Sequence, residues 1–127
     1  MITEDRADIL RREAVLEETT LLFRELGVPV NLRGYWYLRD AVLLSVEDIR
    51  VLNSVTGVLY PAIAQKYQAS VSRVERASRH AIETAWDRGR SDVMDEIFGY
   101  TIKSSRGRPT NSEFIATIAD WVRIRCC

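Results

Sequence analysis

The sequence predicts an all-α fold of about six helices around a helix-turn-helix. Apolar residues recur at spacings of three and four along several segments, as they do on one face of a helix. No segment shows strand-length alternation, an internal repeat or a low-complexity tract. The chain has 127 residues, 46% of them hydrophobic and 28% charged, which fits one globular domain.

The first helix is expected from about Asp5 to Leu26, as one long helix or two short ones. Gly27 and Pro29 end it. A second helix is expected from about Gly34 to Val46, where aromatic and aliphatic residues form one stripe. A short segment, 48–59, follows and is interrupted by Gly57. A compact helix, 60–67, has Pro61 in its first turn.

The next helix is expected over about 72–88, after a tight connection at 68–70, and Gly89 closes it. Ser72 and Glu75 have the spacing of a capping box, although Ser70 is a rival N-cap half a turn earlier. A short helix over 92–98 ends at Gly99, and a polar, basic loop spans 101–109. The last helix, about 111–124, begins from a Thr110 or Asn111 cap.

Charge is distributed unevenly along a chain whose formal net charge is zero. Residues 1–30 hold four arginines and seven carboxylates, so the remainder carries a net charge of +3. A basic remainder permits the local positive face that phosphate contact requires.

Cys126 and Cys127 are adjacent at the end of the chain, where they can neither staple distant segments nor supply a four-ligand zinc site. We therefore expect free thiols and a reducing, cytoplasmic setting. No apolar stretch approaches the roughly 20 residues that span a bilayer, and the charged start lacks a signal-peptide core. No membrane association is expected.

Small and apolar residues fall where a helix-turn-helix locks its two short helices together, at Ile63, Ala64, Tyr67, Ala69, Val74 and Ala77. Such units often have glycine in the turn, whereas this chain has Gln68, so the turn must form without glycine's freedom at positive φ.

In the helix over about 72–88, which is the second helix of this unit, the outer face carries side chains that can read bases. Arg73, Arg76 and Arg79 can each donate two hydrogen bonds to guanine, and Glu75 can accept one from cytosine. In the alternative reading, Glu75 and Arg79 form a solvated i,i+4 ion pair that contributes only about 0.2–0.5 kcal/mol.

His80 is the only histidine, which gives little support to a metal site or a histidine-based triad. Because it lies beside the arginines, we expect it to contact a base or a phosphate. We expect no enzyme activity, no cofactor and no metal, since no acid, base and nucleophile constellation can be assembled. An enzyme is the third reading.

From about Leu22 to Ile124, the chain resembles the C-terminal effector domain of the stage-zero sporulation response regulators. The segments that carry the resemblance are Gly27-Val28-Pro29, Gly34-Tyr35-Trp36-Tyr37-Leu38-Arg39, Val58-Leu59-Tyr60-Pro61, Ser72-Arg73-Val74-Glu75-Arg76-Ala77, Arg79-His80-Ala81-Ile82-Glu83, Phe98-Gly99-Tyr100-Thr101 and Pro109-Thr110-Asn111-Ser112-Glu113-Phe114-Ile115-Ala116.

The resemblance implies a six-helix domain that binds short promoter boxes on double-stranded DNA, often as a homodimer on tandem sites. It implies base readout by the helix over 72–88, and activation or repression through the RNA polymerase sigma factor. We expect phosphate contacts from Ser72, Lys103, Arg106 and Arg108. Phe98, Ala119 and Asp120 are expected to contact polymerase, although Phe98 can instead be a core residue and Ala119 a helix-packing residue.

We expect two parts: a helical extension over 1–20 and the effector domain over 21–127. Full-length family members also have a receiver domain with a phosphorylated aspartate, which this chain lacks, and its carboxyl end is less polar than the usual family tail. The first alternative function is a helical protein-interaction module that does not read DNA. The arginine face argues against that alternative.

Overall fold

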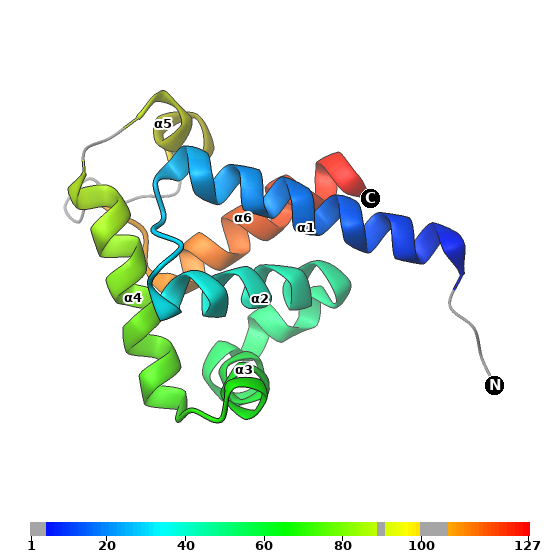
Figure 1. Cartoon of the computed structure of the whole chain (residues 1–127), viewed down its shortest axis with the longest axis horizontal. Coiled ribbons are helices and arrows are strands. Elements are labelled where there is room, and N and C mark those ends of the chain that lie inside the picture. The colour runs from blue at the N-terminus through cyan, green and yellow to red at the C-terminus, as the bar shows by residue number, and fades with distance from the viewer. Residues whose placement is uncertain (1–4, 89–90, 100–106) are drawn as a thin grey trace.

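The computed structural model describes residues 5–88, 91–99 and 107–127. These residues form six α-helices, which confirms the all-α prediction (Figure 1). Between the second and third lie a 3₁₀ segment, η1 (Ile49–Ser54), and a π-helical segment, η2 (Val55–Leu59). The helices are α1 (Arg6–Leu26), α2 (Arg33–Glu47), α3 (Tyr60–Tyr67), α4 (Val71–Asp87), α5 (Asp92–Phe98) and α6 (Asn111–Cys126).

α1 is one continuous helix of 21 residues rather than two short ones. Asp5 caps its start by accepting a hydrogen bond from the Ala7 amide. Gly27 ends it with a φ of 77°, and the amides of Gly27 and Val28 donate back to carbonyls of the last turn. A left-handed residue that satisfies these orphan carbonyls is the usual reason for glycine at a helix end.

α2 lies in the middle of the fold, packed against α1, α4 and α6, with α3 on its other side (Figure 1). Leu38 and Val42 are fully buried in this helix. The crossing of α2 and α4 is close at Gly34, where any side chain would collide with the backbone of Ala77. α2 therefore fixes the position of α4.

The turn between α3 and α4 is formed by Gln68, which adopts the left-handed conformation with a φ of 53°. The next amide, that of Ala69, donates to the Ala64 carbonyl over 2.9 Å. Ser70 then caps α4, because its hydroxyl accepts from the Arg73 amide at 3.1 Å. The capping box expected at Ser72 is therefore wrong, since Ser72 already lies inside the first helical turn.

An aromatic cluster joins α4, α5 and α6 in the core. The Phe98 ring stacks on Phe114 with centroids 5.6 Å apart, and Trp86 meets Phe98 edge-on at 5.2 Å. Thr110 caps α6 through a complete capping box with Glu113. Thr110, rather than Asn111, is thus the N-cap, and α6 is held with its first turn beside α4.

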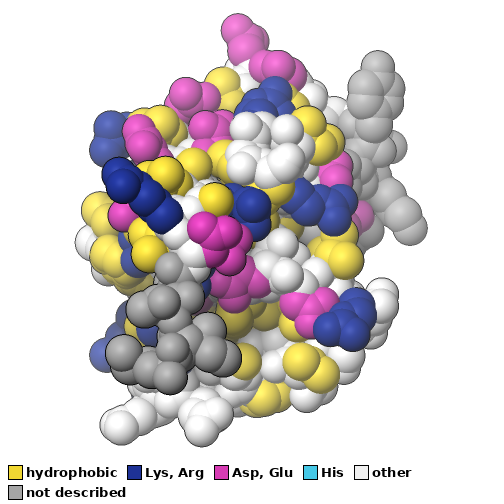
Figure 2. Space-filling model, turned by 90° about the vertical axis from the view of Figure 1, so that its right-hand side faces the viewer, with side chains coloured by type: hydrophobic (Ala, Val, Ile, Leu, Met, Phe, Trp, Pro, Cys, Tyr) yellow, Lys and Arg dark blue, Asp and Glu magenta, His cyan; other side chains and the backbone are white. Residues whose placement is uncertain are grey.

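The end of the molecule where α1 begins and α6 finishes shows hydrophobic side chains among basic and acidic ones (Figure 2). α4 lies at the other end (Figure 1). Within residues 5–88, 91–99 and 107–127, no helix combines the length and the apolar character needed to cross a membrane.

Candidate nucleic-acid interface

α4 has one buried side and one exposed side, as a DNA-reading helix requires. The buried residues, which face α2 and α6, are Val74, Ser78, Ala81, Ile82, Ala85 and Trp86. Ser78 is the polar member of this set, so its burial gives no apolar signal in the sequence. On the exposed side lie Arg73, Arg76 and His80. These three predicted base-reading residues therefore share one solvent-facing surface.

Arg76 makes one long contact within α4, from its Nε to the Ser72 carbonyl at 3.4 Å. The Arg73 side chain makes no ion pair with any residue that the structure describes. Ser72 is exposed in the first turn of α4, and its hydroxyl lies 3.3 Å from that of Ser70. The first turn of a helix offers unpaired amides to an anion, so Ser72 occupies a position suited to phosphate.

Glu75 and Arg79 form the i,i+4 ion pair that the alternative reading anticipated. About half of the Arg79 side chain and a third of the Glu75 side chain remain exposed. Such a surface pair contributes little to stability, so Arg79 can exchange its carboxylate partner at small cost.

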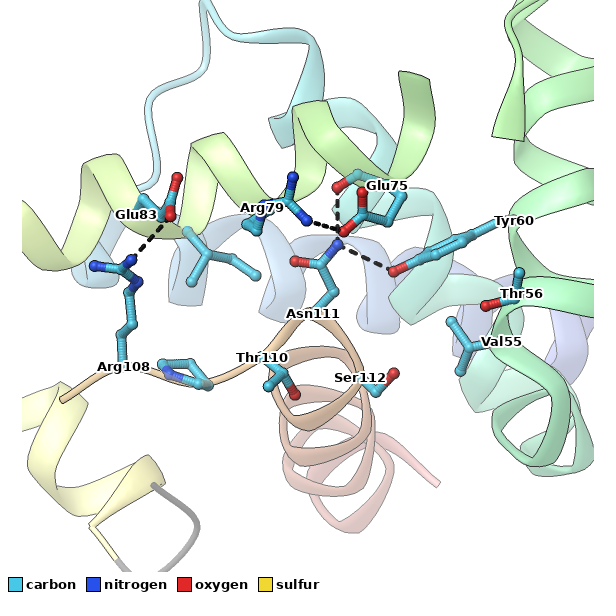
Figure 3. Close-up of a pocket in the computed structure, with 12 residues that line it drawn as sticks. Val55, Thr56, Tyr60, Glu75, Arg79, Glu83, Arg108, Thr110, Asn111 and Ser112 are labelled. Atoms are coloured by element: carbon cyan, nitrogen blue, oxygen red, sulfur yellow. Dashed lines mark hydrogen bonds and ion pairs between the residues drawn. The ribbon is translucent and has the colours of Figure 1, made fainter. Parts of the chain in front are cut away.

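Arg108 reaches from the segment before α6 to α4, where its Nη2 lies 2.9 Å from the Glu83 carboxylate (Figure 3). Arg108 therefore lies on the same side of the molecule as Glu75 and Arg79. The other two predicted phosphate contacts of this loop, Lys103 and Arg106, lie outside the described residues.

A cleft of about 440 Å³ separates this side of α4 from the amino end of α6 (Figure 3). Glu75, Arg79 and Glu83 line its α4 wall, and Thr110 and Ser112 line the opposite one. The cleft thus carries charged side chains of both signs next to the exposed arginines.

Asn111 forms the inner end of this cleft and connects three helices. Its Nδ2 donates to the Tyr60 hydroxyl at 3.0 Å and to the Glu75 carbonyl at 2.9 Å. Burial of the phenol raises the pKa of Tyr60 above its usual value. Because a carbonyl can only accept, the Asn111 amide has one orientation, and its Oδ1 is left buried without a protein partner in the described structure. The sequence offered Asn111 only as a rival cap, since its two partners are 36 and 51 residues away.

Phe98 and Ala119 are buried, with exposed fractions of 0% and 3%. The structure therefore places both in the core, as their alternative readings stated. Asp120 is the exposed member of the three, and its carboxylate lies 3.3 Å from Arg123. A polymerase contact at this site must be made through Asp120, and it stays a prediction.

His80 is exposed on α4, and its backbone carbonyl accepts from the Thr84 hydroxyl. In the part of the chain that the structure describes, no three His, Cys, Asp or Glu side chains come together as a metal site would need. His80 lies on the same exposed side of α4 as Arg73 and Arg76.

Residues 19–122 match the family model described as the C-terminal domain of the sporulation initiation factor Spo0A. The match begins within α1, takes in α2 to α5, and ends in the last turns of α6. It covers the whole α3-turn-α4 unit and every predicted site residue.

Proposed function

The chain belongs to the Spo0A C-terminal family, whose members are DNA-binding regulators of sporulation rather than enzymes, and from this premise we propose that it reads short promoter boxes through α4. In this proposal Arg73, Arg76 and His80 enter the major groove. Each bidentate contact from an arginine to guanine discriminates against a wrong base by about 1–3 kcal/mol.

One observation supports this proposal most strongly. The exposed side of α4 carries its cations at the surface, while its buried side is held in the core by α2 and α6. A base-reading helix must be rigid, because hydrogen bonds to base edges tolerate little displacement. α4 combines these two properties.

The cleft residues complete the proposal. Arg79 and Arg108 are paired with Glu75 and Glu83 in the free protein. On DNA, we propose that Arg108 turns to a phosphate, as do Ser72, Lys103 and Arg106, and that Glu75 and Arg79 read bases. Contacts to phosphate fix the register of the protein without reading sequence.

Two partner contacts belong to the same proposal. Asp120 is exposed on α6 and supplies the surface for the RNA polymerase sigma factor. A homodimer occupies tandem boxes on double-stranded DNA. Residues 21–127 constitute the effector domain and residues 1–20 an extension to it, although α1 crosses this division as one helix. We expect the protein to act in the cytoplasm, without a cofactor.

The decisive experiment is a salt titration of the whole chain on a duplex carrying the family's box and on a scrambled duplex of the same composition. A DNA reader binds the box more tightly at every salt concentration, and both affinities fall as salt rises. Equal affinity for the two duplexes, or no measurable binding, would favour the alternative of a protein-interaction module.

A further inference from the structure

The first half of α1 extends beyond the family domain. Residues 6–18 precede the match that begins at residue 19, and they lie at the end of the molecule remote from α4 (Figure 1). Four large hydrophobic side chains of α1 are exposed: Ile9 (41%), Leu10 (55%), Leu16 (38%) and Leu21 (42%). The first three of these residues precede the family match, and Leu21 lies just inside it. Apolar side chains exposed along one helix indicate an interaction surface.

Two of these residues belong to a regular seam. The core side of α1 uses residues 15, 19, 22 and 26, all buried. The seam residues, Leu10, Ala14, Glu17 and Leu21, are all exposed and follow one another at spacings of four, three and four. This is the spacing of the contact positions in a coiled coil. Because residues 15 and 17 are about 200° apart around the helix, the seam faces away from the core.

We propose that this seam binds the same seam of a second copy, with the two α1 helices antiparallel about a twofold axis between Val15 and Leu16. An interface of this kind must be self-complementary, since each patch meets itself reversed. Leu10 of each copy then lies level with Leu21 of the other, so the interface contains two such leucine pairs. Ala14 lies level with Glu17, and its small side chain leaves room for the Glu17 carboxylate to reach water.

The flanking charges select a second copy and an antiparallel arrangement. Arg11 and Glu18 are seven residues apart, so they lie on nearly the same side of the seam. In the antiparallel pair, Arg11 of one copy lies about 3 Å along the axis from Glu18 of the other, because the helix rises 1.5 Å per residue. A parallel pair would instead bring Arg6 of one copy beside Arg11 of the other, and Glu13 beside Glu18, so that like charges would meet.

The pairing requires little rearrangement of the free protein. Arg11 currently pairs with Asp8 at 3.1 Å, and both side chains are half exposed. Such a surface pair is weak and can be exchanged for a new carboxylate. The interface does not depend on DNA binding, and it leaves α4 free at the opposite end of each copy (Figure 1).

The test is sedimentation velocity of the full chain without DNA, from micromolar to millimolar concentration, with a reductant present so that Cys126 and Cys127 cannot cross-link copies. We expect reversible dimers. Leu10→Glu and Leu21→Glu should each weaken dimerisation by about tenfold or more, because each removes two buried leucine contacts. The matched control is Val30→Glu, since Val30 is also an exposed hydrophobic residue (58%) but lies outside α1. It should dimerise like the parent chain.

A second set of variants tests the geometry. Arg11→Glu and Glu18→Arg should each weaken the dimer, and the double variant should restore it. Glu17→Leu should tighten the dimer, because it replaces the charged side chain opposite Ala14 with an apolar one. A chain that stays monomeric at every concentration, even as Glu17→Leu, overturns the proposal. So does a dimer that is insensitive to Leu10→Glu, since its interface must then lie elsewhere.

Discussion

Gly34 of α2 lies so close to Ala77 of α4 that a Cβ atom added to Gly34 would be 2.0 Å from the Ala77 carbonyl oxygen. The obstacle is backbone, so it cannot move aside as a flexible side chain can. This contact sets how closely the predicted recognition helix approaches the centre of the fold.

Gly34→Ala should therefore destabilise the protein by about 1–3 kcal/mol, the usual cost of forcing extra volume into a packed site. Urea unfolding should show this change as a lower midpoint. The control is Arg33→Ala, because Arg33 is the exposed neighbour of Gly34. An unchanged midpoint for Gly34→Ala would show that α2 and α4 separate without cost.

A second prediction concerns alkaline stability. Burial, together with the hydrogen bond that Tyr67 donates to the Asp40 carboxylate at 2.6 Å, raises the pKa of the Tyr67 phenol to about 12. An unfolded tyrosine titrates near pH 10. The raised pKa favours the protonated form in the folded state, so its stabilisation is complete below about pH 10 and is lost as the pH rises toward 12.

The free energy of unfolding should consequently fall between pH 10 and pH 12, and Tyr67→Phe should make that fall shallower. Denaturant titrations at several pH values measure how steeply the free energy of unfolding falls with pH in the parent chain and in Tyr67→Phe. Tyr60 contributes in the same direction, since its pKa is also raised, so the fall should not vanish. If the free energy of unfolding falls equally steeply with pH in the two proteins, Tyr67 does not contribute to the loss of stability.

Arg108→Ala should weaken binding to every duplex by a similar factor and reduce the salt slope by roughly one, because one phosphate contact is lost. Arg125→Ala is the matched control: this arginine is also exposed, but it stacks on Trp121 near the end of α6, far from α4. If the salt slope of Arg108→Ala equals that of the control, the residue does not contact DNA.

Asp120→Ala should leave both the thermal melt and the DNA affinity unchanged while it lowers promoter activation, because an exposed carboxylate offers a partner charge complementarity. Phe98→Ala should behave differently. It removes a fully buried ring and should cost about 3–5 kcal/mol of stability. A fall in DNA affinity for Asp120→Ala as large as the fall in activation would reject the polymerase assignment.

Local sequence signals were sufficient for most of the fold. Apolar periodicity located the helices, and Gly27 was correctly identified as the end of α1 because a left-handed cap is a local property. The start of α4 was harder to locate. Ser70 and Ser72 carry the same hydroxyl, and only the extended backbone of Ser70 decides between them.

The contacts around the candidate site were less accessible to sequence reasoning. The bond from Asn111 to the Glu75 carbonyl and the pair of Arg108 with Glu83 join residues 36 and 25 positions apart. No spacing rule predicts such contacts, because they depend on how α6 packs against α4. The exposed arginines of α4, by contrast, followed from helical periodicity alone.

The central claim is that α4 reads bases, and Arg76→Ala tests it most directly. Arg76 is exposed, and among the described residues its side chain makes only a long contact to the Ser72 carbonyl of its own helix, so its loss should not disturb the fold. Affinity for the box duplex should fall by about 1–3 kcal/mol, with relaxed preference at one base position and a much smaller change on scrambled DNA. Equal weakening on both duplexes would contradict base reading and make Arg76 a phosphate contact.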